Sequence, residues 1–345
     1  MSRLKNVKWI LWWTLLLTLI FILHQLFWPR HYNVQVREGD INTKLWHLRT
    51  GSTIGFTFIP SKLKEHQTFP IIYLHGGPGG AISKRLIDDL KQLSNDGFDL
   101  YFYDQVGSGN SARLSNIKEY TVQRHIDDLY EIIKNTNSRK VILIGQSWGS
   151  ILAAAYLSQH PETIDKIIFS SPGPIYPINK REIDALAPDN IKIRTPLYTN
   201  REANTSSNNI HISTIKFFAA RFGKKIASDE EVDEYANFLD SKAYKSALCD
   251  TSINLPNRGS NGYYAGIMTY KNLLLLNDFR PKIRGMKIPV LIMKGDCDNQ
   301  PWGAANEYLK LFPNHTFALV TNAGHFISVE QNEIYIREIK KFLVH

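Results

Sequence analysis

The stretch Val141-Ile142-Leu143-Ile144-Gly145-Gln146-Ser147-Trp148-Gly149-Ser150 decides the fold. An apolar run, typical of a buried strand, ends at a glycine and is followed by one serine, a second glycine and a helical pattern. Glycines two positions before and after Ser147 permit a tight turn from strand to helix, because a side chain at either place would collide with the neighbouring backbone. Such a turn holds a hydroxyl above the edge of a sheet, so Ser147 is the candidate nucleophile. The pattern also occurs by chance, so the prediction depends on the rest of the chain.

Composition indicates an ordinary globular protein. The 345 residues are 43% hydrophobic and 21% charged, enough for one large domain with an insertion or for two domains. The net charge is +9, but lysines and arginines are scattered and form no basic stripe with interleaved aromatic residues, so we expect no nucleic-acid partner. The chain has two cysteines, Cys249 and Cys297, which are too few for a disulfide framework or a cysteine metal site. One bridge between them is possible, but the sequence favours unpaired thiols.

A membrane-spanning helix is predicted near the N-terminus. The twenty residues from Trp9 to Trp28 carry no formal charge and would span about 30 Å as a helix, the thickness of a bilayer core. Tryptophans at both ends suit the two membrane interfaces. Arg3, Lys5 and Lys8 precede the segment, which predicts a cytoplasmic N-terminus and an extracytoplasmic location for the domain that follows.

A cleaved signal peptide is the alternative for this segment, since it also begins with a basic and an apolar region. The apolar run ends Leu26-Phe27-Trp28-Pro29-Arg30, without the small-x-small pattern of a cleavage site. The sequence therefore favours an uncleaved signal anchor over residues 1–30.

Strand-like and helical patterns then alternate, which predicts an α/β fold with a mainly parallel sheet covered by helices on both faces. Between residues 172 and 282 the alternation breaks into irregular, helix-rich sequence. We therefore expect a core of residues 31–171 and 283–345 and a helical cap insertion of residues 172–282, placed over the carboxyl ends of the strands. The expected strands are 45–49, 54–59, 70–74, 99–103, 141–144, 166–170, 289–293 and 316–320, and the expected helices are 82–93, 122–134, 148–159, 215–222, 229–240, 264–276 and 334–343.

A serine nucleophile needs a base within hydrogen-bond reach and an acid that orients the base. Strand-end loops offer both in the chain order Ser, Asp, His. His325 follows the last expected strand, and Asp298 follows the preceding one. Asp296 competes for the role of the acid, although its place suits a turn or cap residue. The two aspartates have no accompanying cluster of histidines or acids, so no metal site is expected.

The developing oxyanion needs N–H donors. The backbone N–H of Trp148, beside the nucleophile, is one candidate. The second is expected in the loop His75-Gly76-Gly77-Pro78-Gly79-Gly80, whose glycines leave the backbone accessible. A phosphate-binding loop is the rival interpretation, but the lysine and Ser/Thr of a P-loop are absent.

Three blocks resemble the proline iminopeptidase family of the α/β-hydrolase fold, which removes N-terminal residues, preferentially proline, from peptides. The blocks are the loop 75–80, the sequence Asp104-Gln105-Val106-Gly107-Ser108-Gly109-Asn110-Ser111 and the stretch 145–150. The resemblance implies Ser147, Asp298 and His325 as nucleophile, acid and base, with Gly77 and Trp148 forming the oxyanion hole. It implies no cofactor.

Two departures from the family pattern concern the substrate site. Val106 replaces the family's arginine in the second block, which removes a charge beside the site. The family also binds the substrate's free amino group with glutamates of the cap, and that motif does not align here. Glu230 and Glu234, with Glu231 between them, are the candidates, and a solvated helix face explains them equally well. Tyr263 is a candidate pocket residue, for which packing is the alternative role.

The sequence thus predicts a membrane-anchored serine hydrolase that releases N-terminal, proline-type residues from small peptides. An esterase or lactonase with the same three residues is the nearest alternative, because fold and triad define acyl transfer but not the leaving group. A non-catalytic scaffold that retained the fold is a third hypothesis, against which the complete triad argues. The sequence does not indicate an oligomeric state.

Overall fold

The computed structural model describes residues 2–34, 43–64, 67–253 and 260–344. Within them, eight strands form one sheet in the order β1-β2-β4-β3-β5-β6-β7-β8. β1 and β2 run antiparallel to their neighbours, and the pairs from β4 through β8 are parallel. All eight expected strands are confirmed, with shifted ends. The strands are β1 (Lys44–His47), β2 (Thr53–Ile59), β3 (Ile71–Leu74), β4 (Leu100–Tyr103), β5 (Val141–Gln146), β6 (Ile164–Ser170), β7 (Val290–Gly295) and β8 (His315–Val320).

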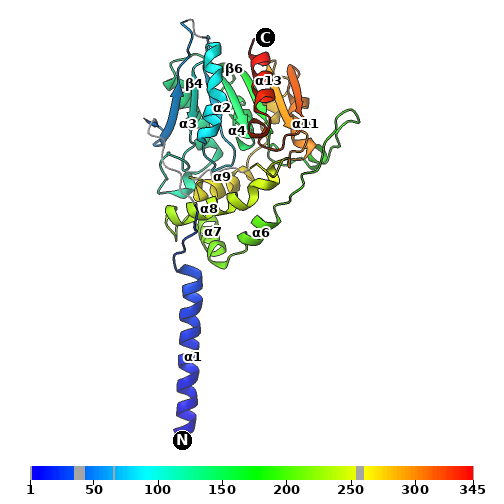
Figure 1. Ribbon diagram of the computed structural model, residues 1–345. Helices are drawn as coiled ribbons and strands as arrows, with labels where there is room; N and C mark the ends of the chain where they lie inside the picture. The colour runs from blue at the N-terminus through cyan, green and yellow to red at the C-terminus, as the bar shows by residue number, and fades with distance from the viewer. Residues whose placement is uncertain (1, 35–42, 65–66, 254–259, 345) are drawn as a thin grey trace.

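Helices cover both faces of this sheet, as predicted (Figure 1). Successive residues of a strand point to opposite faces, so Ile72 and Leu74 of β3 join one buried apolar cluster and Ile71 and Tyr73 join the other. One cluster includes α3 (Val122–Asn135), α4 (Trp148–Leu157) and α11 (Trp302–Leu311). The other includes α2 (Lys84–Leu90) with the 3₁₀ helix η1 (Lys91–Asp96) that follows it, α12 (Ile327–Glu330) and α13 (Asn332–Val344).

The chain leaves the sheet after β6 and returns in β7, which pairs with β6 in parallel. Most of the helices between these strands gather at one end of the sheet (Figure 1). Their arrangement supports the expected cap, whose boundaries at residues 172 and 282 remain a prediction. Its helices are α5 (Lys180–Ile183), α6 (Arg201–Ser207), α7 (Ile210–Phe222), α8 (Asp229–Ala243), η4 (Tyr244–Ala247), α9 (Tyr263–Leu273) and α10 (Arg280–Ile283). Short 3₁₀ helices η2 (Ile117–Glu119) and η3 (Pro161–Thr163) complete the core.

Capping explains one difference from the expected helices. α7 begins at Ile210 rather than at Ile215, because the Asn209 side chain accepts hydrogen bonds from the backbone N–H groups of His211 and Ile212. These two residues are buried, which gives the added first turn a packed face.

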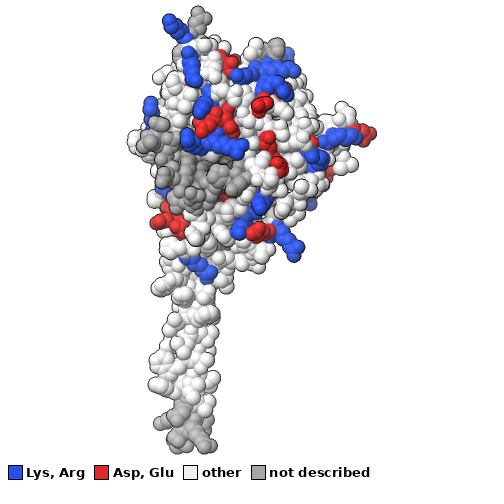
Figure 2. All heavy atoms as spheres, viewed as in Figure 1, with Lys and Arg blue, Asp and Glu red and all other residues white. Residues whose placement is uncertain are grey.

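The helix α1 (Ser2–Phe27) extends away from the body of the protein on the side of the cap (Figure 1). Its segment Val7–Phe27 is long and apolar enough to cross a membrane and is not buried by the rest of the chain. On the face that Figure 2 shows, the part of α1 drawn in white displays no charged side chain, whereas both signs of charge are scattered over the body.

The two cysteines are joined, contrary to the expectation of unpaired thiols. Cys249 and Cys297 form a disulfide across 48 positions of sequence, with their Cα atoms 5.4 Å apart. The segment after η4 packs on the strand-end loops, where the backbone N–H of His325 donates to the Ala247 carbonyl at 2.8 Å. Tertiary packing of the cap brings the two thiols together. The spacing of the cysteines in the sequence does not indicate this pairing.

Candidate active site

Ser147 occupies a sharp turn between β5 and α4. Its backbone has φ 56° and ψ −116°, a positive φ that is uncommon for a residue with a side chain. A Cβ atom at Gly149 would collide with the Leu74 carbonyl oxygen, and one at Gly145 would collide with the Gly149 carbonyl. The predicted strand–turn–helix geometry is therefore present, and both flanking positions require glycine.

His325 is oriented by a buried carboxylate. Its Nδ1 atom lies 2.9 Å from Oδ1 of Asp298, which also accepts a hydrogen bond from the backbone N–H of Gln300 at 2.9 Å. The Lys294 ammonium lies 3.2 Å from the other carboxylate oxygen. Burial opposes ionisation of Asp298, but the charges of His325 and Lys294 and these hydrogen bonds outweigh it and lower the pKa of Asp298 to about 2. The carboxylate is thus ionised at neutral pH.

The competing carboxylate, Asp296, does not contact His325. Both of its oxygens bind the Arg194 guanidinium, at 2.8 and 2.9 Å, and its backbone carbonyl accepts from the Arg194 backbone N–H. Asp296 therefore ties the cap segment around Arg194 to the loop after β7. The geometry favours Asp298 as the partner of His325.

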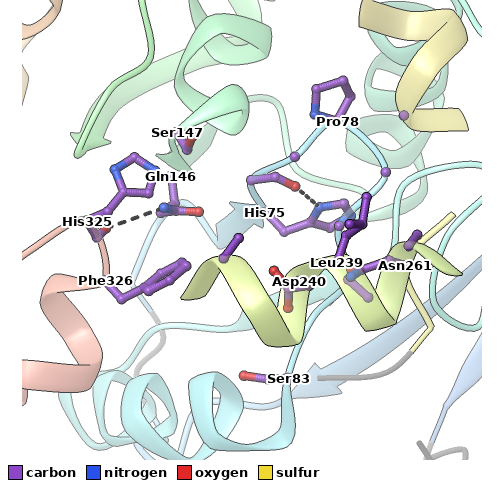
Figure 3. Close-up of a pocket in the computed structure, with 18 of the residues that line it drawn as sticks. His75, Pro78, Ser83, Gln146, Ser147, Leu239, Asp240, Asn261, His325 and Phe326 are labelled. Atoms are coloured by element: carbon purple, nitrogen blue, oxygen red, sulfur yellow. Dashed lines mark hydrogen bonds between the residues drawn. The ribbon is translucent and has the colours of Figure 1, made fainter. Parts of the chain in front are cut away.

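Ser147 and His325 line the same cavity, of about 680 Å³, between the sheet and the cap (Figure 3). No hydrogen bond joins the two side chains among the contacts of the described residues. Proton transfer from Ser147 needs such a contact, and in enzymes without substrate it is often long or poorly aligned. The side chain of Gln146 donates to the His325 carbonyl at 3.5 Å, which links the residue before Ser147 to the histidine loop.

The loop 75–80 is held against the turn at Ser147 by one glutamine. Gln105 donates from Nε2 to the His75 carbonyl at 3.0 Å and accepts from the indole N–H of Trp148 at 2.8 Å. Its backbone N–H donates to Nε2 of His75 at 2.9 Å. Burial lowers the pKa of the His75 ring, so the ring is neutral and donates from Nδ1 to the Gly76 carbonyl. His75 and Gln105 therefore set the position of the loop.

The two predicted oxyanion donors belong to the turn at Ser147 and to the loop 75–80. Trp148 is the first residue of α4, where a backbone N–H has no partner within the helix. Gly77 belongs to the loop 75–80, which lines the cavity. Within the described parts of the chain, neither N–H donates to a backbone carbonyl. Both groups are available for a substrate oxygen.

Of the expected substrate-binding residues, the structure places only Tyr263 in the cavity wall. Glu230 is exposed and lies outside the cavity. Glu234 accepts a hydrogen bond from the backbone N–H of Tyr32 at 3.1 Å, and the buried Glu231 accepts from the backbone N–H of Arg30 at 2.9 Å. Glu231 and Glu234 face the segment that follows α1, and the opposite side of α8 faces the cavity.

Two aspartates supply the carboxylates that line the cavity instead. Asp240 comes from α8 and makes no side-chain hydrogen bond or ion pair with the described residues; Figure 3 shows it among the residues that line the cavity. Asp89 comes from α2, lies 3.9 Å from Arg85 and has one buried oxygen without a hydrogen-bond partner in the described chain. Periodicity along α8 could have identified Asp240, four residues after Ala236, which also lines the cavity.

Comparisons with known proteins agree with this architecture. Residues 70–331 match the family model of the alpha/beta hydrolase fold. A proline iminopeptidase of Heyndrickxia coagulans is 26% identical over 280 residues, which cover 79% of this chain and 90% of that protein. Among solved structures, an esterase from Exiguobacterium antarcticum has a TM-score of 0.58 at 18% identity, covering 88% of this chain and 99% of the other. The proline iminopeptidase of Mycobacterium smegmatis has a TM-score of 0.56 at 17% identity, with 87% and 97% covered. The expected fold and the resemblance to proline iminopeptidases are confirmed.

Proposed function

The chain belongs to the α/β-hydrolase family, and on that premise we propose that it is a serine hydrolase that releases N-terminal, proline-type residues from peptides. The observation that carries the proposal is the convergence of Ser147, the Asp298–His325 pair and the loop 75–80 on one cavity. The curated relatives named proline iminopeptidase, similar over most of both chains, support the same substrate class.

In the proposed mechanism, His325 takes the proton of Ser147 as the serine oxygen attacks the scissile carbonyl. The negative charge on the carbonyl oxygen is stabilised by the N–H groups of Gly77 and Trp148. The His325 imidazolium, held by Asp298, then gives its proton to the leaving amine as the C–N bond breaks. The N-terminal residue remains as an ester on Ser147. Water next attacks this ester while His325 takes its proton, which returns to the serine oxygen as the acid is released.

The same chemistry would serve an esterase or lactonase, and proteins with those names share the fold. A carboxylate for an α-ammonium group is the feature that separates the alternatives. Asp240 fits this role, because it comes from the cap, lines the cavity and has no side-chain partner among the described residues. We therefore favour the peptidase.

Substrates with free and blocked amino groups test this assignment. Proline arylamide should be cleaved much faster than its N-acetylated form and faster than short acyl esters. Equal rates for free and blocked substrates, or a preference for esters, would support the esterase or lactonase instead. A scaffold would cleave none of them and would not react with a fluorophosphonate probe.

Ser147→Ala should abolish both turnover and probe labelling without loss of folding. Ser158→Ala is a matched control, because Ser158 lies at the other end of α4 and bonds only to the Ala155 carbonyl through its side chain. Retained activity of Ser147→Ala would refute the mechanism.

We further propose that α1 remains attached as a membrane anchor, with the hydrolase outside the cytoplasm. His211 contacts the Leu26 carbonyl at 2.7 Å and Glu231 at 2.6 Å, and Glu231 accepts from the backbone N–H of Arg30. The segment that signal-peptide cleavage would remove is thus bound by the cap. The disulfide supports an oxidising compartment. Immunoblotting of membrane and soluble fractions is the test; a shortened protein in the soluble fraction would contradict the anchor.

A further inference from the structure

Phenylalanine rings join the end of α1 to α7 in the cap. Phe27 is the last residue of the apolar segment Val7–Phe27, and its ring centroid lies 6.4 Å from that of Phe218. The Phe218 ring lies 5.6 Å from Phe222, which lies 5.8 Å from Phe217. α7 therefore lies at the level where the apolar segment of α1 ends.

The outer face of α7 is apolar and exposed. The side of the helix that packs into the cap carries the buried residues Ile212, Ile215 and Ala219. Ile210 and Phe217, two helical turns apart on the opposite side, are 60% and 56% exposed. Phe222, at the end of the helix, is 45% exposed. Large apolar side chains gathered in this way mark an interaction surface.

Charge on α7 indicates the kind of partner. The helix contains Lys216 and Arg221, both exposed, and no aspartate or glutamate. Exposed aromatic and aliphatic side chains combined with lysine and arginine, without acidic residues, are typical of helices that lie in a membrane interface. The cations suit anionic lipid headgroups, and the aromatic rings suit the boundary between headgroups and acyl chains.

The junction between α1 and the cap fixes the orientation of α7. The Leu26 carbonyl contacts His211 of α7, and the backbone N–H groups of Arg30 and Tyr32 donate to Glu231 and Glu234 of α8. The Tyr32 ring also packs 5.1 Å from that of Tyr235. These contacts hold the cap at the end of α1, on the side from which the helix departs (Figure 1).

We propose that α7 lies in the surface of the same bilayer that α1 crosses, with Ile210, Phe217 and Phe222 inserted between the lipids. The inference rests on the proposed membrane anchor and is independent of the hydrolase activity. Lys216 lines the cavity beside the inserted Phe217. The cap wall of the cavity therefore includes a residue of the helix that we place at the membrane surface.

Site-specific quenching in vesicles tests the proposal on the full chain. The native cysteines are paired, so Ile210→Cys introduces one free thiol for a pyrene label. The labelled protein is reconstituted in phosphatidylcholine and phosphatidylglycerol vesicles with lipid that carries a doxyl group near the headgroup. Phe21→Cys in α1 is the membrane control. Glu333→Cys is the solvent control, because Glu333 is exposed and belongs to α13, a helix that lies away from α1 (Figure 1).

We expect roughly a twofold or greater loss of pyrene emission at positions 210 and 21 and none at position 333. Adding Phe217→Ser and Phe222→Ser to the Ile210→Cys chain should restore emission at position 210. Quenching at position 21 alone would overturn the proposal while retaining the anchor, and pyrene excimer emission would then identify a second copy of the chain as the partner. Absence of quenching at both positions would overturn the anchor as well.

Discussion

Nδ1 of His325 lies 2.9 Å from Oδ1 of Asp298, and the carboxylate of Asp296, two positions earlier, is bound entirely to Arg194. Asp298→Asn should therefore lower kcat by about 10⁴-fold, because an amide no longer stabilises the imidazolium or selects the correct tautomer of His325. Asp296→Asn should leave kcat within about tenfold of the wild type, because losing the Asp296 carboxylate affects only the packing of the loop against the cap. Steady-state kinetics with a proline arylamide measures both variants. A larger loss for Asp296→Asn would assign the acid to that residue.

Lys294 stabilises the ionised form of Asp298 from a buried position. The pKa of Asp298 is lowered in the folded state to about 2, from 3.8, so its ionisation contributes stability above pH 3.8 that is lost as the pH falls through 2. Without the lysine this pKa rises and part of that contribution, roughly 2 kcal/mol in the wild type, disappears. Lys294→Met should thus be destabilised most at pH 6 and less at pH 3.

Denaturant unfolding at the two pH values, in detergent, checks this prediction. Because His325 still pairs with Asp298, the destabilisation at pH 6 should exceed that at pH 3 by about 2 kcal/mol or less. Lys166→Met is the control. Lys166 donates only to the backbone carbonyls of Phe342 and Leu343 among the described residues, so the destabilisation caused by its replacement should not depend on pH in this range. An equal destabilisation of Lys294→Met at both pH values would show that Lys294 stabilises the fold through packing and not through its charge.

Gln105 is predicted to position the oxyanion loop without touching the substrate. Gln105→Leu removes the bonds to the Trp148 indole and the His75 carbonyl, so the loop and the turn at Ser147 lose their relative alignment. A displacement of about 1 Å lowers kcat by roughly 10²-fold with little change in KM. The control is Gln123→Leu on α3, whose side chain bonds to Asp127 and Gln159 at the surface. A rise in KM at unchanged kcat would indicate a role in substrate binding instead.

The sheet was predictable because it depends on local sequence, and the same local patterns indicate the candidate triad. Buried parallel strands appear as apolar runs, and the loops after them present Ser147, Asp298 and His325 in the expected order. In the sequence, Asp298 differs from Asp296 as a candidate acid only by its position after β7. The structure adds that Asp296 pairs with Arg194 from the cap, whereas Asp298 contacts His325.

The cap was less predictable because its contacts are tertiary. Glu230, Glu231 and Glu234 lie near the start of α8 and resembled an acidic binding face. Two of them bind backbone N–H groups of the segment after α1, more than 200 positions away in sequence, and the third is exposed. Sequence spacing could not reveal that partner, nor that Cys249 meets Cys297.

Asp240 should determine the preference for a free amino group. Asp240→Asn keeps the size of the side chain but removes its charge, which should raise KM for proline arylamide by about tenfold or more. Hydrolysis of the N-acetylated substrate should be unchanged, because that substrate has no cation to bind. The ratio of kcat/KM for the two substrates measures the effect. If Asp89→Asn reduces the ratio and Asp240→Asn does not, the carboxylate on α2 binds the amine.

The disulfide ties the cap to the loop that carries Asp298. Closing a loop across 48 positions stabilises the fold by roughly 4 kcal/mol through the unfolded chain, so replacing Cys249 and Cys297 together by alanine should lower the Tm clearly. Reductant should lower the Tm of the wild type in the same way and leave the double variant unchanged. Maleimide labelling of unfolded protein from isolated membranes provides the direct measurement, with both thiols modified only after reduction. Labelling without reductant would show that the thiols are free in the cell, which would contradict both the bridge and the extracytoplasmic location that it supports.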